Sequence, residues 1–251
     1  MHRTLLIDGD IVVYQYSSTV EHEVDWGNDV WSLWADAKEA QQLILQYIDI
    51  LVDETAADDF IFCFSDKDNF RKDIDSNYKS NRKGKRKPVC YKSLKQWITD
   101  EYKTETWDRL EADDVMGIMA TSTMLEGEKV IVSEDKDLKT IPGMHLDKDT
   151  GEVYEINEDE ANRYWMMQTL TGDATDGYPG CPTIGKVRAE RILDAVGPSL
   201  DEMWQAVVAA YEKQGLDESA ALTQARLARI LRPCDYASES VTLWTPSTKT
   251  S

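Results

Sequence analysis

Three short apolar runs, each ending in aspartate, place the strongest constraint on how this chain folds. They have the length of β-strands and are rich in Ile, Val, Leu and Phe: TLLID (4–8), DFIFCFSD (59–66) and KVIVSEDKD (129–137). Apolar residues at helical spacing separate them, over 29–53 and again over 112–125. Because strand–helix–strand units fold with their strands parallel, the alternation predicts an α/β fold with a central, mainly parallel sheet flanked by helices. Residues 144–147 and 152–156 are expected to add a further strand and its return.

Acidic residues follow the expected strands at the point where each strand ends. The strand-end acids are Asp8, Asp66, Asp135 and Asp137. Because the carboxyl ends of parallel strands meet at one edge of a sheet, these side chains are expected to converge there. The stretch LEADDVMG (110–117) adds Glu111, Asp113 and Asp114 at a helix start, where capping is the plainer explanation. Capping does not explain acids at strand ends, and Glu111 is expected on the side of its helix that faces the sheet.

The residue types at this edge favour hard divalent cations. The chain has 47 acidic residues but three His, and its four Cys lie far apart without a C-x-x-C pair. This composition argues against imidazole catalysis, a zinc site and a disulfide framework. Clustered carboxylates repel one another unless a cation neutralises them, and oxygen ligands select Mg²⁺ or Mn²⁺. Seven or more acids predict two ions, one activating water and the other stabilising the leaving oxygen of a phosphoryl displacement.

The charge distribution points to a polyanionic substrate. The net charge of −19 argues against indiscriminate binding of nucleic acid. Residues 79–95, which we call the basic segment, nevertheless hold eight Lys and Arg and no acid. A solvated loop is the plainer explanation of such a run, but an isolated basic segment in an acidic chain indicates where a polyanion docks. Together with the acids, it predicts a two-metal phosphodiesterase that acts on nucleic acid.

The rest of the sequence predicts the compartment and the domain organisation. The N-terminal apolar stretch contains Asp8 and Asp10, which a signal peptide does not tolerate, and no apolar run reaches membrane-spanning length. We therefore expect a cytoplasmic protein. We also expect an α/β core over residues 1–156 and a helical C-terminal region over 157–251.

The C-terminal region carries its own acids beside a turn. Asn157 and Glu160 are spaced as a capping box that opens a helix over 157–170. Asp173 and Asp176 then precede a Gly- and Pro-rich turn within residues 171–197, which end in a helix, and residues 198–232 continue as helix.

Five motifs in order give the chain a resemblance to a known superfamily. The motifs are LLIDGD, FSDKDNFRKDIDSNYKSNRK, LEADDVMG, VIVSEDKDLKT and TGDATDGYPGCPTIGKVRAE. They resemble those of the 5′→3′ exonuclease and flap-endonuclease superfamily, and most of all the 5′→3′ exonucleases of short-tailed podophages. The resemblance covers about residues 4 to 195, and five ordered motifs are far more specific than any one of them.

The resemblance implies a division of the acids between two Mg²⁺ ions, for which Mn²⁺ can substitute. It assigns Asp8, Asp66, Glu111 and Asp113 mainly to the first ion, and Asp135, Asp137 and Asp173 mainly to the second. Asp114 and Asp176 are implied in inner or outer shells. Asp10 matches the phage proteins but not the wider superfamily, so its role stays open.

The resemblance also implies how DNA is held. Tyr78, Lys79 and Arg82 match the stretch that reaches the scissile phosphate, with Lys79 and Arg82 as catalytic groups, at the base of a helical arch over about residues 78–110. A helix-hairpin-helix region over about residues 170–196 is implied to grip duplex DNA and to hold K⁺ through the main chain of Leu170, Thr171, Pro179, Cys181 and Ile184. The other implied DNA contacts are Arg71, Lys83, Lys85, Arg86, Lys87, Gly180, Gly185 and Lys186. Implied substrates are double-stranded DNA with 5′ ends, flapped DNA and RNA–DNA hybrids, in the cytoplasm of a bacterial host.

Three alternatives explain parts of the same pattern. DGDIV resembles the Asp-x-Asp start of haloacid-dehalogenase-type phosphatases, with Asp8 as nucleophile and Asp10 as acid/base. That alternative leaves Glu111, Asp135 and the basic segment unexplained. A PIN-like ribonuclease shares acid-ended strands but lacks the helix-hairpin-helix turn and the arch. A DNA-structure-binding protein without catalysis has no need of two metal shells.

Overall fold

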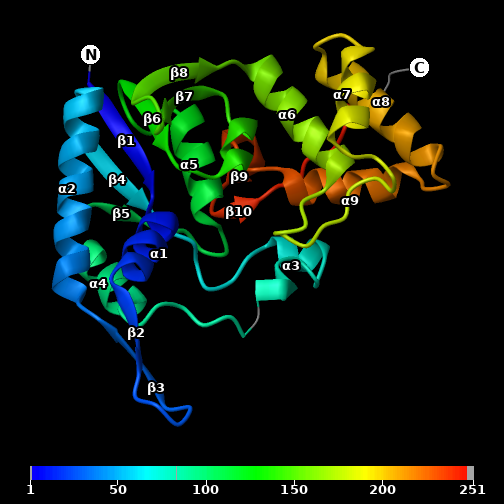
Figure 1. Cartoon of the computed structure of the whole chain (residues 1–251). Helices are drawn as coiled ribbons and strands as arrows, with labels where there is room; N and C mark the ends of the chain where they lie inside the picture. The colour runs from blue at the N-terminus through cyan, green and yellow to red at the C-terminus, as the bar shows by residue number, and fades with distance from the viewer. Residues whose placement is uncertain (1, 83, 248–251) are drawn as a thin grey trace. The chain divides into compact units, whose positions relative to one another are not determined.

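The structure is a computed structural model that describes residues 2–82 and 84–247 (Figure 1). The strands are β1 (Arg3–Asp8), β2 (Glu21–Asp25), β3 (Trp31–Ala35), β4 (Asp59–Cys63), β5 (Thr104–Glu105), β6 (Glu128–Val132), β7 (Gly143–Asp147), β8 (Glu152–Ile156), β9 (Tyr236–Ala237) and β10 (Ser240–Val241). The helices are α1 (Gly9–Thr19), α2 (Ala37–Thr55), α3 (Arg71–Ile74), α4 (Tyr91–Glu101), α5 (Ala112–Thr121), α6 (Glu158–Thr171), α7 (Lys186–Asp194), α8 (Leu200–Glu212) and α9 (Glu218–Ala228). Short 3₁₀ helices are η1 (Ser80–Arg82), η2 (Lys136–Thr140) and η3 (Pro233–Asp235).

The main sheet is mainly parallel, as the strand–helix alternation predicts. Its strand order is β5-β4-β1-β6-β7-β8. The central strand β1 pairs in parallel with β4 and with β6, and the outer pairs β4–β5 and β6–β7 are parallel too. The predicted α/β fold class is therefore confirmed, and the carboxyl ends of β1, β4 and β6 lie at one edge of the sheet.

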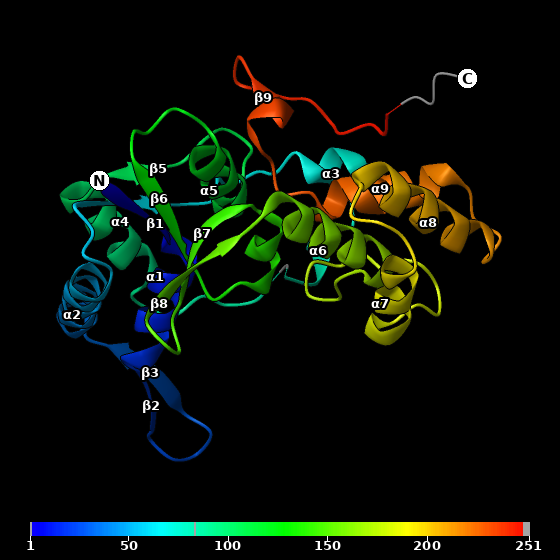
Figure 2. The same ribbon diagram turned by 90° about the horizontal axis from the view of Figure 1, so that it is seen from above.

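Alternating residues of the central strands pack against helices on opposite faces. Leu5 and Ile7 of β1 belong to the same buried core as Phe62 and Val130, together with apolar residues of α1, α2 and α4. The helix α5 packs against β1, β4 and β6, and Figure 2 shows it across the sheet from α1, α2 and α4. Because both faces are covered, the strands read as nearly continuous apolar runs.

The chain divides into two compact units, each assembled from separate segments. The first, which we call the sheet unit, consists of Met1–Lys67, Gly84–Asp135 and Met144–Tyr154. The second, which we call the helical unit, consists of Asp68–Lys83, Lys136–Gly143 and Glu155–Ser251. The basic segment therefore contributes residues to both units.

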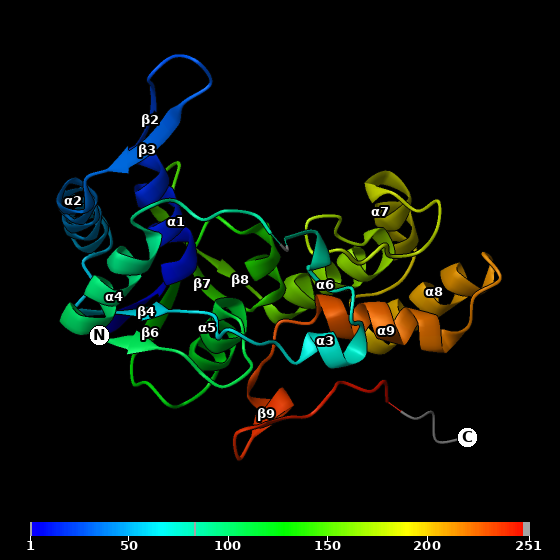
Figure 3. The same ribbon diagram turned by 90° about the horizontal axis from the view of Figure 1, so that it is seen from below.

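The helical unit has its own core. Trp165 of α6 and Trp204 of α8 are buried in it with residues of α7 and α9. The indole N–H of Trp165 donates to the carbonyl of Ala225 at 2.8 Å, and the hydroxyl of Tyr211 donates to the carbonyl of Thr169 at 2.7 Å. The short helix α3 packs against α9 (Figure 3). Asn157 and Glu160 form the predicted capping box at the start of α6.

The prediction of one helix over residues 29–53 was wrong for its first part. Residues 31–35 form β3, which pairs with β2 in an antiparallel hairpin, and α2 begins only at Ala37. Asn28 and Asp29 have positive φ angles in the hairpin turn, and the Asp36 carboxylate accepts hydrogen bonds from the N–H groups of Lys38 and Glu39. The turn at Asn28 and Asp29 and the cap at Asp36 divide this stretch into a hairpin strand and a helix. The apolar spacing of the sequence fits a strand and a helix equally well. The hairpin extends away from α2 (Figure 1).

The strands before Asp66 and Asp135 are shorter than predicted. The strand β4 ends at Cys63 and β6 at Val132, so Asp66 and Asp135 lie three residues beyond their strands. Residues 136–140, which include Asp137, form the 3₁₀ helix η2. Within residues 2–82 and 84–247, no helix combines the length and the apolar character needed to cross a bilayer.

Candidate metal and nucleic-acid site

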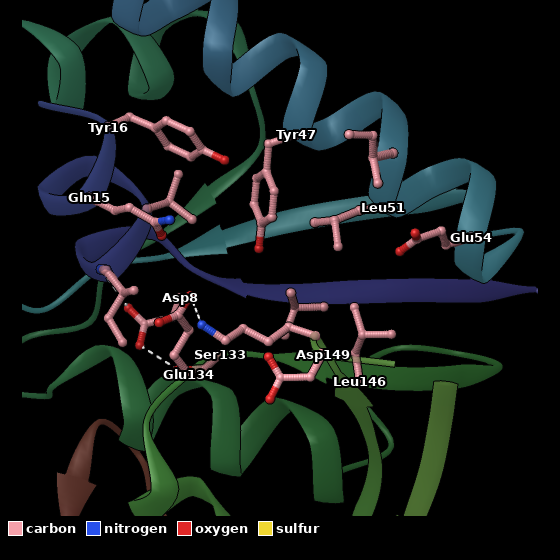
Figure 4. Close-up of a pocket in the computed structure, with 15 residues that line it drawn as sticks. Asp8, Gln15, Tyr16, Tyr47, Leu51, Glu54, Ser133, Glu134, Leu146 and Asp149 are labelled. Carbon is pink, nitrogen blue, oxygen red and sulfur yellow. Dashed lines mark hydrogen bonds and ion pairs between the residues drawn. The ribbon is translucent and has the colours of Figure 1, made fainter. Parts of the chain in front are cut away.

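Asp8 and Asp135 of the sheet unit are linked through one serine hydroxyl. Asp8 is the last residue of β1 and the N-cap of α1, where its Oδ1 accepts a hydrogen bond from the N–H of Ile11 at 3.1 Å. Its Oδ2 accepts a hydrogen bond from the hydroxyl of Ser133 at 3.0 Å, and the Ser133 oxygen accepts one from the N–H of Asp135 at 3.1 Å. The two strand-end acids are therefore linked through Ser133, which Figure 4 shows next to Asp8.

The Asp8 carboxylate has a strongly raised pKa. The pKa of Asp8 is raised to about 7, mainly by burial and also by the carboxylates of Asp10 and Asp135, against the lowering effect of its hydrogen bonds to Ile11 and Ser133. Negative charge is therefore poorly tolerated at this position unless a cation offsets it. A buried carboxylate with two further carboxylates nearby fits the donor chemistry of a hard divalent cation.

The pKa of Asp8 has a consequence for the stability of the protein in EDTA. Because the folded-state pKa of about 7 exceeds the ordinary value of 3.8, the contribution of Asp8 is fully present below about pH 4 and is lost as pH rises to about 7. Asp8→Asn keeps the cap but cannot ionise. We therefore expect its free energy of unfolding at pH 8 to exceed that of wild type by roughly 2–4 kcal/mol, at about 1.4 kcal/mol per pKa unit. This gain appears as a higher urea concentration at the midpoint of unfolding.

This difference should shrink toward zero at about pH 3, below the ordinary value of 3.8, where Asp8 is mostly protonated in both states. Urea titrations in EDTA at the two pH values measure it, with Asp53→Asn on the exposed face of α2 as the control that should show no pH-dependent gain. A stability difference that is the same at both pH values would contradict the assignment.

Asp66 connects the end of β4 to the start of α5. Its Oδ2 accepts a hydrogen bond from the N–H of Arg109 at 3.0 Å, and its own N–H donates to the carbonyl of Leu110 at 2.9 Å. Glu111 follows directly as the N-cap of α5. Asp66 and Glu111 therefore lie on two segments that are bonded together, as the sequence predicts for acids of one cluster.

The acids at the start of α5 also cap that helix. The Oδ2 of Asp114 accepts a hydrogen bond from the N–H of Glu111 at 3.2 Å, and these two residues form a reciprocal capping box. Asp114 is fully buried, whereas Glu111 and Asp113 are half-buried. Capping, the plainer explanation, thus holds for Glu111 and Asp114, and it leaves Asp113 outside the cap.

The acids of the helical unit gather around Tyr178. Asp137, Asp176 and Asp173 all lie near enough to raise the pKa of its phenol, although burial raises it more. The Oδ1 of Asp137 accepts a hydrogen bond from the side-chain amide of Gln168 at 2.6 Å. Asp173 is buried, and its Oδ2 accepts one from the ammonium of Lys136 at 2.8 Å.

The predicted phosphate-contacting residues of the helical unit converge on Asp176. The guanidinium of Arg82 lies 2.7 Å from its Oδ1, the ammonium of Lys79 lies 3.4 Å from its Oδ2, and the hydroxyl of Tyr78 donates to Oδ2 at 3.1 Å. The N–H of Lys79 also donates to the carbonyl of Asp176 at 2.8 Å. The structure therefore brings together Asp176 and the Tyr78, Lys79 and Arg82 of the sequence motif.

The other basic residues differ in how much surface they offer. Arg86 is bound by the Glu21 carboxylate at the start of β2, and the ammonium of Lys87 lies 3.9 Å from the centre of the Tyr91 ring. Lys85 is exposed, and Lys83 lies outside the described residues.

Arg71 occupies the interior of the helical unit. Only 2% of it is exposed, and its guanidinium donates hydrogen bonds to the carbonyls of Leu227 and Arg229. The prediction that Arg71 contacts DNA does not fit this burial. Its role in the structure is to join α3 to the chain that follows α9.

The Gly- and Pro-rich turn is closed by a tight backbone contact. Gly172 and Gly180 both have φ of 68°, and a Cβ on Gly180 would lie 2.3 Å from the nitrogen of Gly172, so neither position tolerates a side chain. The N–H of Cys181 donates to the carbonyl of Leu170 at 2.8 Å, and the N–H of Gly180 donates to the Gln224 side chain at 2.9 Å.

The predicted potassium and DNA-contacting groups lie on both sides of this contact. Leu170 and Thr171 precede Gly172, Pro179 directly precedes Gly180, and Cys181 and Ile184 follow Gly180. Gly180 is buried, so its backbone serves the turn itself. Gly185 and Lys186 are exposed at the start of α7, where helix N–H groups suit an anion.

The acids are spread along several elements instead of forming a preassembled shell. Within residues 2–82 and 84–247, no three His, Cys, Asp or Glu side chains are grouped closely enough to hold a metal ion by themselves. Protein donors bind oxygens of several predicted ligands. Ser133 donates to Asp8, Gln168 to Asp137 and Lys136 to Asp173.

A pocket of about 400 Å³ opens beside Asp8 in the sheet unit. Figure 4 shows Tyr16, Tyr47 and Glu134 around it, with Ser133 at its base next to Asp8. Solvent can therefore approach Asp8 from the side of α1 and α2.

Three groups next to the acids escape a search for acids alone. Ser133 positions Asp8 and Asp135, Lys136 binds Asp173, and the Ser65 hydroxyl accepts a hydrogen bond from the N–H of Ala112 at 3.0 Å. Lys136 was recognisable from its place between two predicted ligands, Asp135 and Asp137. The two serines carry no such signal, because a hydroxyl acquires its role only through packing.

Solved structures share this fold at low sequence identity. A complex of the bacteriophage T5 flap endonuclease with DNA and metal ions matches with a TM-score of 0.68 and 15% identity, covering 93% of this chain and 90% of that chain. The catalytic core of Rad2 in complex with DNA substrate matches with a TM-score of 0.53 and 12% identity, covering 98% of this chain and 83% of that chain.

Sequence relatives match over nearly the full length. The exodeoxyribonuclease of Enterobacteria phage T3 is 30% identical over 279 residues, covering 96% of this chain and 92% of that protein. The exonuclease of Escherichia phage T7 is also 30% identical over 279 residues, covering 96% of this chain and 93% of that protein. The family model of the 5′-3′ exonuclease, N-terminal resolvase-like domain, matches residues 3–164. Because that match spans more than half of the sequence and two phage exonucleases align with almost all of it, the chain belongs to the 5′→3′ exonuclease family and is a 5′→3′ exonuclease.

Proposed function

We propose that this protein hydrolyses double-stranded DNA from 5′ ends with two Mg²⁺ ions, cleaves 5′ flaps, and removes RNA from RNA–DNA hybrids. The observation that carries the proposal is the environment of Asp8. A buried carboxylate whose pKa is about 7, held through Ser133 to a second strand-end acid, is costly without a divalent cation. The DNA and metal ions in the T5 flap-endonuclease structure support the same substrate and cofactor class. The phage relatives favour a cytoplasmic role in a bacterial host.

We assign the acids to the ions as the sequence motifs imply. The first Mg²⁺ is bound by the carboxylates of Asp8, Asp66, Glu111 and Asp113. The second is bound by those of Asp135, Asp137 and Asp173, with Asp114 and Asp176 in inner or outer shells. When bound, the ions lower the pKa of a water nucleophile and stabilise charge on the leaving oxygen. Mn²⁺ has compatible oxygen chemistry and substitutes for Mg²⁺.

The cationic groups of the helical unit supply the phosphate contacts. Lys79 and Arg82 present an ammonium and a guanidinium on one carboxylate, Asp176. A DNA phosphate competes for the same two cations, because like a carboxylate it offers two oxygens that share one negative charge. Lys79 and Arg82 then hold the scissile phosphate and stabilise the charge that grows on it, while Tyr78 orients Asp176 through its hydroxyl.

The remaining contacts serve the rest of the DNA. Gly185 and Lys186 at the start of α7 bind backbone phosphate of the duplex, and main-chain carbonyls of Leu170, Thr171, Pro179, Cys181 and Ile184 hold K⁺ beside it. Lys83, Lys85, Arg86 and Lys87 of the arch segment guide the single strand. The close backbone contact between Gly172 and Gly180 fixes the turn that carries these carbonyls.

The experiment that tests this function follows DNA labelled separately at each end. We expect the 5′-labelled strand of a duplex to lose its label as short products first, in Mg²⁺ and not in excess EDTA, and flap and RNA–DNA substrates to be cut as well. A 3′-labelled strand should shorten from its unlabelled end. Full cleavage in EDTA, or loss of the 3′ label first, would overturn the proposal, and turnover of p-nitrophenyl phosphate instead of DNA would favour the phosphatase alternative.

A further inference from the structure

Asp10 is bound by three donors from two other elements of the sheet unit. Its Oδ2 accepts a hydrogen bond from the N–H of Ser65 at 2.8 Å, and its Oδ1 accepts one from the hydroxyl of Tyr91 at 3.1 Å. The ammonium of Lys95 lies 3.5 Å from the same Oδ1. Both carboxylate oxygens of Asp10 are therefore engaged by protein groups, and two of the three donors, Tyr91 and Lys95, belong to one helix, α4.

Each donor belongs to a segment that the proposed function uses. Ser65 directly precedes Asp66, a proposed ligand of the first ion. Tyr91 and Lys95 lie one turn apart at the start of α4, where the helix overlaps the end of the basic segment. Asp10 itself lies in the first turn of α1, two residues after Asp8.

The contacts continue from α4 to Lys87, earlier in the basic segment, and to Phe64, the residue that follows β4. The ammonium of Lys87 lies 3.9 Å from the centre of the Tyr91 ring, and that of Lys95 lies 4.4 Å from the centre of the Phe64 ring. Lys95 also donates to the carbonyl of Ser65 at 3.4 Å. A continuous set of contacts thus runs from Lys87 through Tyr91 and Asp10 to the residue beside Asp66.

We propose that Asp10 is a positioning residue: it holds Tyr91 and Lys95 of α4 against the end of β4, so that the basic segment presents a DNA strand to the metal-binding acids in one register. This inference rests on the proposed function. It assigns Asp10 a role through α4 and not as a metal ligand. Without the contact, DNA still binds, but its scissile phosphate is poorly aligned and cleavage at saturating DNA is slower.

The test compares Tyr91→Phe, Asp10→Asn and the double variant with wild type. Tyr91→Phe removes one hydroxyl and keeps the ring beneath Lys87, so the fold should be preserved. We expect each single variant to lower the single-turnover rate at saturating duplex DNA by about tenfold, the scale of one hydrogen bond to a charged group. The double variant should be no slower than the slower single variant, because both changes break the same contact.

Three further measurements separate positioning from other roles. The Mg²⁺ concentration at half-maximal rate should be the same in all variants, and the dissociation constant for DNA in EDTA should change less than threefold. The control variant Glu101→Gln removes an exposed charge from the same helix, outside the basic segment, and should keep the wild-type rate at saturating DNA.

Distinct outcomes would overturn the inference. A higher Mg²⁺ requirement in Asp10→Asn alone would make Asp10 a metal ligand, and multiplicative rate effects would separate Asp10 from Tyr91. Lower thermal stability with unchanged rates would reduce the contact to a structural one. A failure of the proposed function is recognised differently, because wild type and Glu101→Gln would then lack Mg²⁺-dependent cleavage.

Discussion

Asp135→Asn and Asp173→Asn are expected to lower the single-turnover rate of DNA cleavage in Mg²⁺ by about a thousandfold or more. A bound metal ion supplies several kcal/mol of transition-state stabilisation, and each ~1.4 kcal/mol is a factor of ten. The dissociation constant for DNA in EDTA should stay equal or fall, because a negative charge that repels phosphate is gone. The two measurements together distinguish ligation of a cation from attraction of DNA.

The structure sharpens this prediction for each acid. In Asp173→Asn the amide can still accept the hydrogen bond from the N–H of Thr175, which measures 2.7 Å in the native protein, but it loses the ion pair with Lys136. If Asp135 or Asp173 only supported the fold, replacement would cost about 1 kcal/mol of stability and leave turnover nearly intact. Asp53→Asn, an isosteric change on the exposed face of α2, is the matched control. Near-wild-type rates for the Asp135 or Asp173 variant would argue against two-metal hydrolysis.

Lys79→Ala and Arg82→Ala are expected to slow cleavage at saturating DNA by about a hundredfold each, as removal of one transition-state donor does elsewhere. Their ammonium and guanidinium both reach Asp176, so they share a location where a phosphate oxygen can replace a carboxylate oxygen. Single-turnover rates at saturating DNA measure this effect separately from binding.

Lys85→Ala is the control from the same basic segment. Lys85 is exposed, so we expect its loss to weaken binding and to lower the salt dependence of binding by about one unit of slope, while the saturated rate is kept. If Lys79, Arg82 and Lys85 variants all lost affinity alone, the division between catalytic and docking cations would be wrong.

The parallel sheet was predictable because its strands are buried on both faces. Leu5, Ile7 and Phe62 lie in uninterrupted apolar runs, which are typical of strands covered on both faces. The acids follow where these runs end. The β2–β3 hairpin was not predictable from spacing. Trp31 and Trp34, 60% and 55% exposed, are three residues apart, which fits a helix as well as a strand with its side chains in solvent.

The positions of the acids beyond the strand ends were predictable, but the groups that contact them were not. Asp8 and Asp66 follow strand-length runs and therefore stand out in the sequence. The hydroxyl that joins Asp8 to Asp135, and the donors that occupy Asp10, come from segments 50 or more residues away along the chain, since Ser133, Ser65 and Tyr91 are separated from them by 125, 55 and 81 positions. Only the fold brings such partners together. Arg71 shows the opposite case, because a basic residue inside a motif that the sequence predicts to contact DNA is buried in the core of the helical unit.

The most direct measurement of the two-metal account is the number of Mn²⁺ ions that the protein binds together with uncleaved DNA, counted by electron paramagnetic resonance. Wild type should bind two ions, and Asp173→Asn should bind one fewer at the same free Mn²⁺ concentration, with cleavage lost in parallel. Asp53→Asn should bind two ions and cleave normally. Full cleavage by a protein that binds fewer than two ions, or two ions bound with wild-type affinity by Asp173→Asn, would contradict the account.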